Sequence, residues 1–409
     1  MNIAIAILGL GLLVLVHEMG HFFVSLAVGM RPRKFYVGFP PALVKTTRNG
    51  IEYGLGAIPL GGYVRIPGMH RPAAKDVDHV FARALHAAPE LTGPAERLKR
   101  SLAAEDYETA KLRLAEFHEA AKEAGVPSVD KQVLDLEDAL SPQAYWRAPT
   151  WKRVAAIAAG PLTNILFAVV LFAVVFAAAA GKATTSVQRV VPTENGQKSP
   201  ALVAGLRAGD RISAIQVGHQ WYVVDKASDI TSTISGSHGA PIRLLVSRDD
   251  RAVTLPAVRP LMTDGVYRLG FQLDAVPLAT GPALWEAVKT TGYVTRDTAS
   301  ALGGLFRSKD RRQLSGPVGI VPAAADTLHY GWASYLLMLG FISLSLALFN
   351  LLPLLPLDGG HIAFSLLEGI RGRAIAREVY ERVSAIGITL VLLLFIVGLS
   401  NDVGRLGGG

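Results

Sequence analysis

The chain has 409 residues, of which 50% are hydrophobic and 18% charged, and its formal net charge at pH 7 is +8. The apolar residues are bunched into long blocks, which excludes an ordinary soluble domain and indicates several membrane-spanning segments with soluble inserts. The positive charges lie largely beside these blocks, so nucleic-acid binding is not expected, and the absence of cysteine excludes disulfides and thiolate zinc ligands.

The first apolar run extends from Ile3 to Val28 and predicts a transmembrane helix within residues 1–30. A helix of about 26 residues rises roughly 39 Å, which is enough to cross a bilayer. The run contains His17-Glu18-Met19-Gly20-His21, in which two imidazoles one turn apart can hold one Zn²⁺ while the glutamate acts as general base. A structural or transport role for the cluster is the alternative. The motif favours a metalloprotease that works within the membrane.

Residues 31–70 change to a strand pattern. Leu43 to Arg48 and Ile51 to Gly56 flank Asn49-Gly50, a dipeptide typical of a type I′ turn, so a β-hairpin is predicted here. An ordinary solvent-exposed hairpin is one interpretation of this pattern.

Residues 71–150 are rich in Ala, Glu, Lys and Arg and contain helix-like runs such as Pro94 to Ala124. They predict a charged insert that is helical or partly disordered. Its charged side chains are expected to form a solvated face, with a regulatory docking surface as the alternative.

The second predicted span covers residues 151–182 and includes Gly160-Pro161-Leu162-Thr163-Asn164. Pro161 cannot donate a backbone hydrogen bond, so the carbonyl of Ile157 loses its helical partner. Asn164 adds an amide that can pair with an extended peptide or a developing oxyanion. A proline kink with a helix-packing asparagine is the alternative.

Residues 184–260 are polar and strand-like and predict a separate β-domain, which contains the run from Ala204 to Ile212 with its Gly-Asp turn. Residues 281–330 follow as a connector. Within them Pro282 to Phe306 has the apolar spacing of an amphipathic helix that lies at a membrane surface.

The third predicted span occupies residues 331–361 and the fourth residues 383–400. Pro353 and Pro356 break the third span, and Asp358 follows them as the best candidate for a third zinc ligand. His361 is a rival ligand, and a solvated aspartate in a helix-ending loop is the alternative. Arginines flank the connections after the first and third spans, which predicts that these connections are cytoplasmic and that the metal lies nearer that face.

Three motifs in this order resemble those of the site-2 intramembrane metalloproteases. They are His17 to His21 in the first span, Gly160 to Asn164 in the second, and Asn350-Leu-Leu-Pro with Leu357-Asp358-Gly359 in the third. The resemblance implies that His17, His21 and Asp358 hold Zn²⁺, that Glu18 activates water and that Asn164 lies near the active site and binds substrate. The soluble β-domain and Ser315 to Ile320 are similar to the bacterial branch that regulates envelope-stress sigma factors, the RseP type.

This resemblance implies a polytopic α-helical membrane protein of about four transmembrane helices, with a membrane-associated re-entrant β-hairpin and an extracytoplasmic PDZ-like β-domain. Its expected activity is zinc-dependent cleavage of single-span proteins in a bacterial cytoplasmic membrane, after another protease has trimmed them. Anti-sigma factors and signal-peptide remnants are candidate substrates. The hairpin segment Ile51 to Leu55 is expected to bind substrate as an added strand. The PDZ-like domain is expected to act as a size filter over the outer entrance, with peptide recruitment as its alternative. A catalytically silent PDZ membrane scaffold is the runner-up function.

Overall fold

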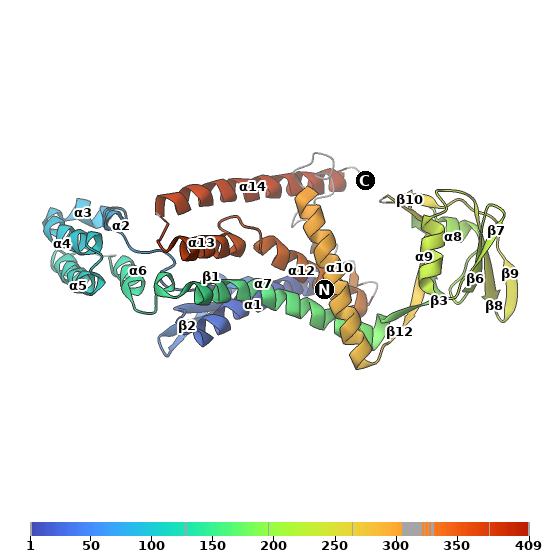
Figure 1. The fold of residues 1–409 in the computed structure, drawn as a ribbon, viewed down its shortest axis with the longest axis horizontal. Coiled ribbons are helices and arrows are strands. Elements are labelled where there is room, and N and C mark those ends of the chain that lie inside the picture. The colour runs from blue at the N-terminus through green and yellow to red at the C-terminus, as the bar shows by residue number, and fades with distance from the viewer. Residues whose placement is uncertain are drawn as a thin grey trace. The chain divides into compact units, whose positions relative to one another are not determined.

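The computed structural model describes residues 2–126, 129–194, 196–263, 265–304, 321–322, 324–325, 327–328, 331–375 and 377–407 (Figure 1). The chain divides into two compact units. One unit comprises Met1–Ala168 with Thr291–Gly409, and the other comprises Val169–Thr290.

Four helices are long and apolar enough to cross a membrane. They are α1 (Asn2–Ala27), α7 (Thr150–Val175) with the π-helical continuation Phe176–Ala180, α12 (Trp332–Asn350), and α14 (Arg377–Gly407) with its apolar part at Glu378–Ser400. The predicted fold class, four membrane helices combined with β-structure, is confirmed. The fourth apolar segment is longer than its predicted range, because its helix begins at Arg377 rather than at residue 383.

Helices α1, α7 and α12 pack closely through small and polar residues. Gly20 of α1 lies against Ala159 and Thr163 of α7, where any Cβ would collide with them. The Tyr335 hydroxyl of α12 donates to the Ile5 carbonyl of α1 at 2.8 Å. Such approaches let backbones come close where lipid supplies no hydrophobic drive for association. The contact at Gly20 lies within the His-Glu-x-x-His motif of α1.

Strands β1 (Lys34–Arg48) and β2 (Ile51–Arg65) form an antiparallel sheet with an unusual register. Asn49 and Gly50 have positive φ values of 53° and 75°, which agrees with the predicted turn. The beginning of β1 pairs with both ends of β2, because Tyr36 is opposite Gly54 on one side and Tyr63 on the other. The two strands therefore build four adjacent strand segments.

This register overturns one sequence expectation. The segment from Glu52 to Leu55 pairs with the beginning of β1 on one side and with the end of β1 on the other. It has no free edge and cannot accept an added strand, because both of its sides are already occupied. The local hairpin pattern did not reveal the second pairing. The segment Gly62 to Arg65 has β1 as its only strand neighbour among the described residues.

The insert after the sheet is helical, as predicted. Its helices are α2 (Ala74–Val80), α3 (Ala82–Ala87), α4 (Thr92–Ala103), α5 (Tyr107–Glu123) and α6 (Asp130–Leu140), followed by a 3₁₀ turn at Tyr145–Arg147. They enclose a hydrophobic core that includes Phe81, Leu98, Phe117 and Leu140. The insert is therefore a folded helical module with its own core.

The second unit contains a β-sheet with strand order β12-β3-β6-β8-β9, and β7 pairs with β6. The strands are β3 (Lys182–Val190), β6 (Arg211–Val217), β7 (Gln220–Val223), β8 (Ile242–Arg248), β9 (Arg251–Thr254) and β12 (Phe271–Val276). Its helices are α8 (Pro200–Val203) and α9 (Ala227–Ser235), and the short hairpins are β4 (Thr193–Glu194) with β5 (Gln197–Lys198) and β10 (Leu261–Thr263) with β11 (Val266–Arg268). The predicted boundary at residue 260 is too early, because β12 pairs with β3.

Helix α10 (Thr280–Gly304) follows this sheet, where an amphipathic helix is predicted. Its side chains Leu284, Trp285, Val288 and Tyr293 are exposed apolar groups. The motif Ser315 to Ile320 lies outside the described residues. The last element before α14 is α13 (Asp358–Arg371), which begins at the predicted metal ligand.

A buried ion pair fixes the Gly-Asp turn of the β-sheet unit. Asp210 accepts hydrogen bonds from Arg248 Nε and Nη2, both at 2.7 Å, and from the Arg207 backbone N–H at 2.8 Å. Burial would raise the pKa of Asp210, but these donors hold it below its ordinary value. The carboxylate therefore stabilises the folded domain above its unfolded pKa of about 3.9, and this contribution is lost as pH falls through the lower, folded pKa.

We expect Asp210→Asn to destabilise the β-sheet unit by about 3 kcal/mol at pH 7, because it leaves Arg248 without its charged partner. Hydrogen exchange of the sheet amides in the intact protein measures this loss. At acidic pH, where the native carboxylate is protonated, the difference between native and variant should shrink. Asp249→Asn, the same change in an exposed turn, is the control. Equal exchange in native and Asp210→Asn protein at pH 7 would contradict the assignment.

Candidate metal and active site

His17 and His21 face one direction from α1, as their spacing predicts. Their Nε2 atoms are 3.2 Å apart, and both residues are buried. Both imidazoles are therefore available to a buried ligand.

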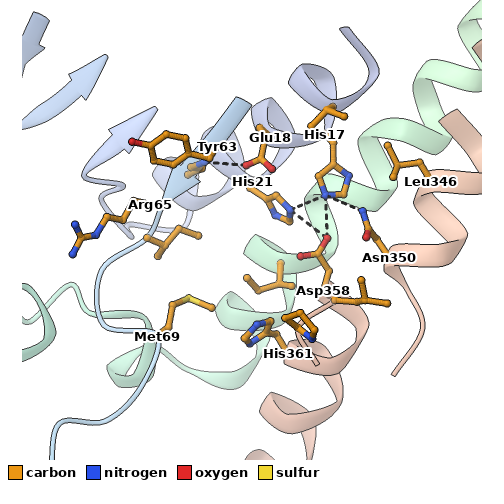
Figure 2. A pocket seen from close by; sticks show the side chains of 16 residues that line it. His17, Glu18, His21, Tyr63, Arg65, Met69, Leu346, Asn350, Asp358 and His361 are labelled. Carbon is orange, nitrogen blue, oxygen red and sulfur yellow. Dashed lines mark hydrogen bonds and ion pairs between the residues drawn. The ribbon is translucent and has the colours of Figure 1, made fainter. Parts of the chain in front are cut away.

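Asp358 joins the two histidines from the far end of the sequence (Figure 2). Helix α12 ends at Asn350, and the proline-containing turn that follows leads directly into α13. Gly359 lies so close to the carbonyls of Leu351 and Leu352 that a Cβ would collide with them, so the turn requires glycine there. This tight turn places Asp358 Oδ2 at 3.1 Å from His17 Nε2 and 3.4 Å from His21 Nε2.

The three donor atoms fit a zinc ion. Zn²⁺ bound at about 2.0 Å in tetrahedral geometry separates its ligands by about 3.3 Å, which agrees with the three distances of 3.1, 3.2 and 3.4 Å. Two imidazoles and one carboxylate are also a ligand set that zinc enzymes use, with a fourth position left for water. His361 lines the same cavity but does not belong to the metal-binding group found among the described residues.

A second layer of contacts orients the imidazoles. His21 Nδ1 donates to the Ala156 carbonyl of α7 at 2.9 Å, which leaves Nε2 free for a metal. Pro161 is predicted to free the carbonyl of Ile157, but His21 donates to the neighbouring carbonyl of Ala156. Gly160 lies against both imidazoles, and a Cβ there would collide with them. The close approach of α7 therefore depends on a glycine inside the Gly160 to Asn164 motif.

Asn164 is fully buried behind His17, with Nδ2 at 3.4 Å from His17 Nδ1 and with no hydrogen-bond partner for Oδ1 among the described residues. Rotation of the amide by 180° exchanges these atoms and allows Oδ1 to accept a hydrogen bond from Nδ1–H, the tautomer that a metal on Nε2 requires. The side chain does not line the cavity. Its contact with substrate stays a prediction, whereas its contact with His17 is direct.

Glu18 lies beside the metal group and accepts a hydrogen bond from the Val64 backbone N–H at 3.0 Å (Figure 2). This contact joins the motif of α1 to the end of β2. Asn350 Nδ2 also approaches His17 Nε2, at 3.5 Å. Sequence reasoning did not identify the Val64 contact, because no local pattern links a strand amide to a helix glutamate 46 residues away.

The group opens into a cavity of about 580 Å³. Side chains from α1, β2, α12 and α13 line it, among them Val14, Tyr63, Leu346 and His361. The volume and the mostly apolar walls suit a short peptide segment with apolar side chains. The arrangement therefore combines a metal-binding group, a carboxylate base and room for an extended chain.

Comparison with known proteins gives one family for nearly the whole chain. Residues 5–394 match the family described as Peptidase family M50. The histidines, Glu18 and Asp358 all fall within the matched residues.

Relatives align over almost their full lengths. A protein of Agrobacterium fabrum named "Putative zinc metalloprotease" is 29% identical over 98% of this chain and 95% of its own. One of Lactococcus lactis with the same designation is 27% identical over 97% and 96%. "Zinc metalloprotease RasP" of Geobacillus kaustophilus is 27% identical over 96% and 95%. The chain is thus similar in length and sequence to bacterial zinc metalloproteases.

Proposed function

We propose, because this chain belongs to peptidase family M50, that it cleaves single-span membrane proteins within their transmembrane segments. It is a zinc metalloprotease and a multi-pass membrane protein. The observation that supports intramembrane cleavage is the position of His17, Glu18 and His21 on α1, a helix that can itself cross the bilayer. The decisive experiment is cleavage of a reconstituted single-span protein by the native chain and by Glu18→Gln.

In the proposed mechanism His17, His21 and Asp358 hold the metal. Bound Zn²⁺ would polarise the scissile carbonyl and acidify the attacking water. Glu18 accepts a proton from that water at its carboxylate and then donates it to the departing amine nitrogen, which completes peptide hydrolysis. Asn164 and the Ala156 carbonyl hold the two imidazoles in the orientation that directs Nε2 toward the metal.

A transmembrane substrate has to unwind before it can be cut, because helical pairing hides its peptide groups. The segment Gly62 to Arg65 is the edge that lies beside the metal group, and the Val64 N–H points away from the sheet toward Glu18. We propose that a substrate carbonyl replaces Glu18 as the acceptor of this N–H, so that the substrate adds as a strand. This edge replaces Ile51 to Leu55 as the proposed binding strand.

Val64→Pro removes the edge donor, and we expect it to lower the cleavage rate at least about tenfold while zinc content stays at the native level. The pairing of the sheet should survive, since this N–H points outward. Val64→Ala keeps the N–H and should stay within about twofold of the native rate. Native cleavage by the proline variant would exclude strand addition at this edge.

We place the arginine-rich connections after the first and third spans on the cytoplasmic side, and the PDZ-like β-domain on the opposite side. We propose that this domain excludes substrates whose extracytoplasmic part has not yet been removed, because rejection needs only a steric clash. A second role is supported by its cavity of about 620 Å³, lined by Ile230, Ile234, Phe271 and Leu273. Such a cavity favours recruitment of a peptide end.

Deletion of residues 182–276, with a flexible linker in their place, distinguishes the two roles. For a size filter, we expect the deleted protein to cut full-length substrates that the native protein ignores. For recruitment, cleavage of even trimmed substrates should be lost although the remaining protein is folded and retains zinc. Cleavage assays on full-length and trimmed forms of one single-span protein provide the measurement. If the chain were a catalytically silent scaffold, neither the native nor the deleted protein would cut either form.

A further inference from the structure

The helical insert contacts the same strand that borders the metal site. Arg65, the last residue of β2, forms an ion pair with Asp135 of α6. Arg33, just before β1, forms a second ion pair with Asp138 of α6, with Nη2 at 2.6 Å from Oδ1. The Arg33 N–H also donates to the Arg65 carbonyl at 2.7 Å. Both ion pairs therefore meet the sheet at one end, next to the edge segment Gly62 to Arg65.

The two ion pairs differ in burial. The difference lies in the carboxylates, because the Asp138 side chain is 4% exposed and that of Asp135 is 40% exposed, whereas Arg33 and Arg65 are both partly exposed, at 40% and 32%. An exposed pair contributes little, but a buried carboxylate deprived of its partner is strongly destabilising. Of the two ion pairs, the one between Asp138 and Arg33 therefore contributes more to holding the insert against the sheet.

Backbone contacts continue this attachment beyond β2. Tyr145 and Trp146, in the 3₁₀ turn after α6, donate their backbone N–H groups to the carbonyls of Pro67 and Gly68, both at 3.0 Å. Gly68 has a φ of +66° and packs against Ala144 so closely that a Cβ would collide. The Tyr145 hydroxyl lies 3.0 Å from Ser365 Oγ of α13, the helix that begins with Asp358. One turn of the insert therefore contacts both the strand exit and the helix of the metal ligand.

We propose that the insert positions the substrate-binding edge, with Asp138 and Arg33 as positioning residues; this inference rests on the proposed function. Among the described residues the edge segment has a strand on one side only, so fewer backbone hydrogen bonds hold it than hold the inner segments of the sheet. Fixing its end in advance reduces the conformational entropy that a substrate strand would otherwise lose on binding. The insert thus acts on cleavage through the strand, without touching the substrate or the metal.

The test compares Asp138→Asn, Arg33→Met and their double variant in the intact protein. Hydrogen exchange at Gly62 to Arg65 should become about tenfold faster or more in each, and the double variant should be no worse than the worse single variant. Exchange in the core of α5 should stay native. For a designed single-span substrate with a helix-breaking glycine, KM should rise about tenfold, with kcat and zinc content little changed. Arg33→Lys, which keeps the charge, should restore most of the native behaviour.

Asp78→Asn is the matched control, because it removes an ion pair with Lys99, 3.0 Å long, inside the insert. It should leave exchange at Gly62 to Arg65 unchanged. Native exchange there in Asp138→Asn would overturn the proposal, and so would faster exchange spread evenly over the whole insert. If the native protein fails to cleave any single-span substrate, the proposed function fails, while the exchange experiment still decides whether the insert positions the strand.

Discussion

Glu18→Gln is expected to abolish cleavage while the protein keeps its zinc. Glutamine has nearly the same size and can still accept the Val64 hydrogen bond through its carbonyl oxygen, but it cannot take a proton from water at neutral pH. Loss of a general base typically lowers the rate by 10²- to 10⁴-fold. The measurement is the single-turnover cleavage rate of a reconstituted single-span protein, together with the molar zinc content.

Glu96→Gln makes the same chemical change in the insert, where the Glu96 side chain forms an ion pair with Lys99, and should cleave at the native rate. Cleavage by zinc-loaded Glu18→Gln at more than about a tenth of the native rate would show that another group serves as the base. Such a result would leave the metal group intact and change only the role of Glu18.

Asp358→Ala is expected to remove zinc and activity together. The variant leaves two imidazoles, which is one ligand fewer than catalytic zinc sites normally have. Loss of a residue that merely orients a metal ligand lowers metal affinity by at most about 100-fold. Because Asp358 is itself a proposed ligand, we expect zinc affinity to fall by more than that. Competition with a chelator of known affinity measures this change.

His361→Ala provides the comparison, because His361 lines the same cavity three residues later. It should keep native zinc affinity. If His361→Ala loses zinc and Asp358→Ala keeps it, the assignment of the third ligand is reversed.

The parts of the fold that the sequence predicts correctly depend on short-range patterns. A run of apolar residues long enough for a bilayer predicts a membrane helix, and two histidines one turn apart share a face of α1. The turn at Asn49-Gly50 has the same local origin. The sequence favours Asp358 as the third ligand because two prolines break the helix before it, although His361 satisfies the same criterion.

Other features depend on pairings between distant segments. Nothing near Tyr36 indicates that it pairs with Gly54 and Tyr63 at once, and nothing near Phe271 indicates that β12 joins β3. The Ala156 carbonyl became a partner of His21 only through the close approach of α7, which Gly160 allows. A strand or helix pattern specifies what an element is, whereas its neighbours depend on the whole fold.

The metal group has a consequence for how the protease is made. Two of its donor residues, His17 of α1 and Asp358 of α13, are 341 residues apart in the sequence. At about 5 to 20 residues per second, a ribosome needs roughly 17 to 70 s to travel from one to the other. During that time the emerging chain displays only two imidazoles and no completed zinc centre. The nascent protein therefore shares its membrane with other newly inserted helices while it is still unable to cut them, and it can become a protease only after Asp358 has been translated.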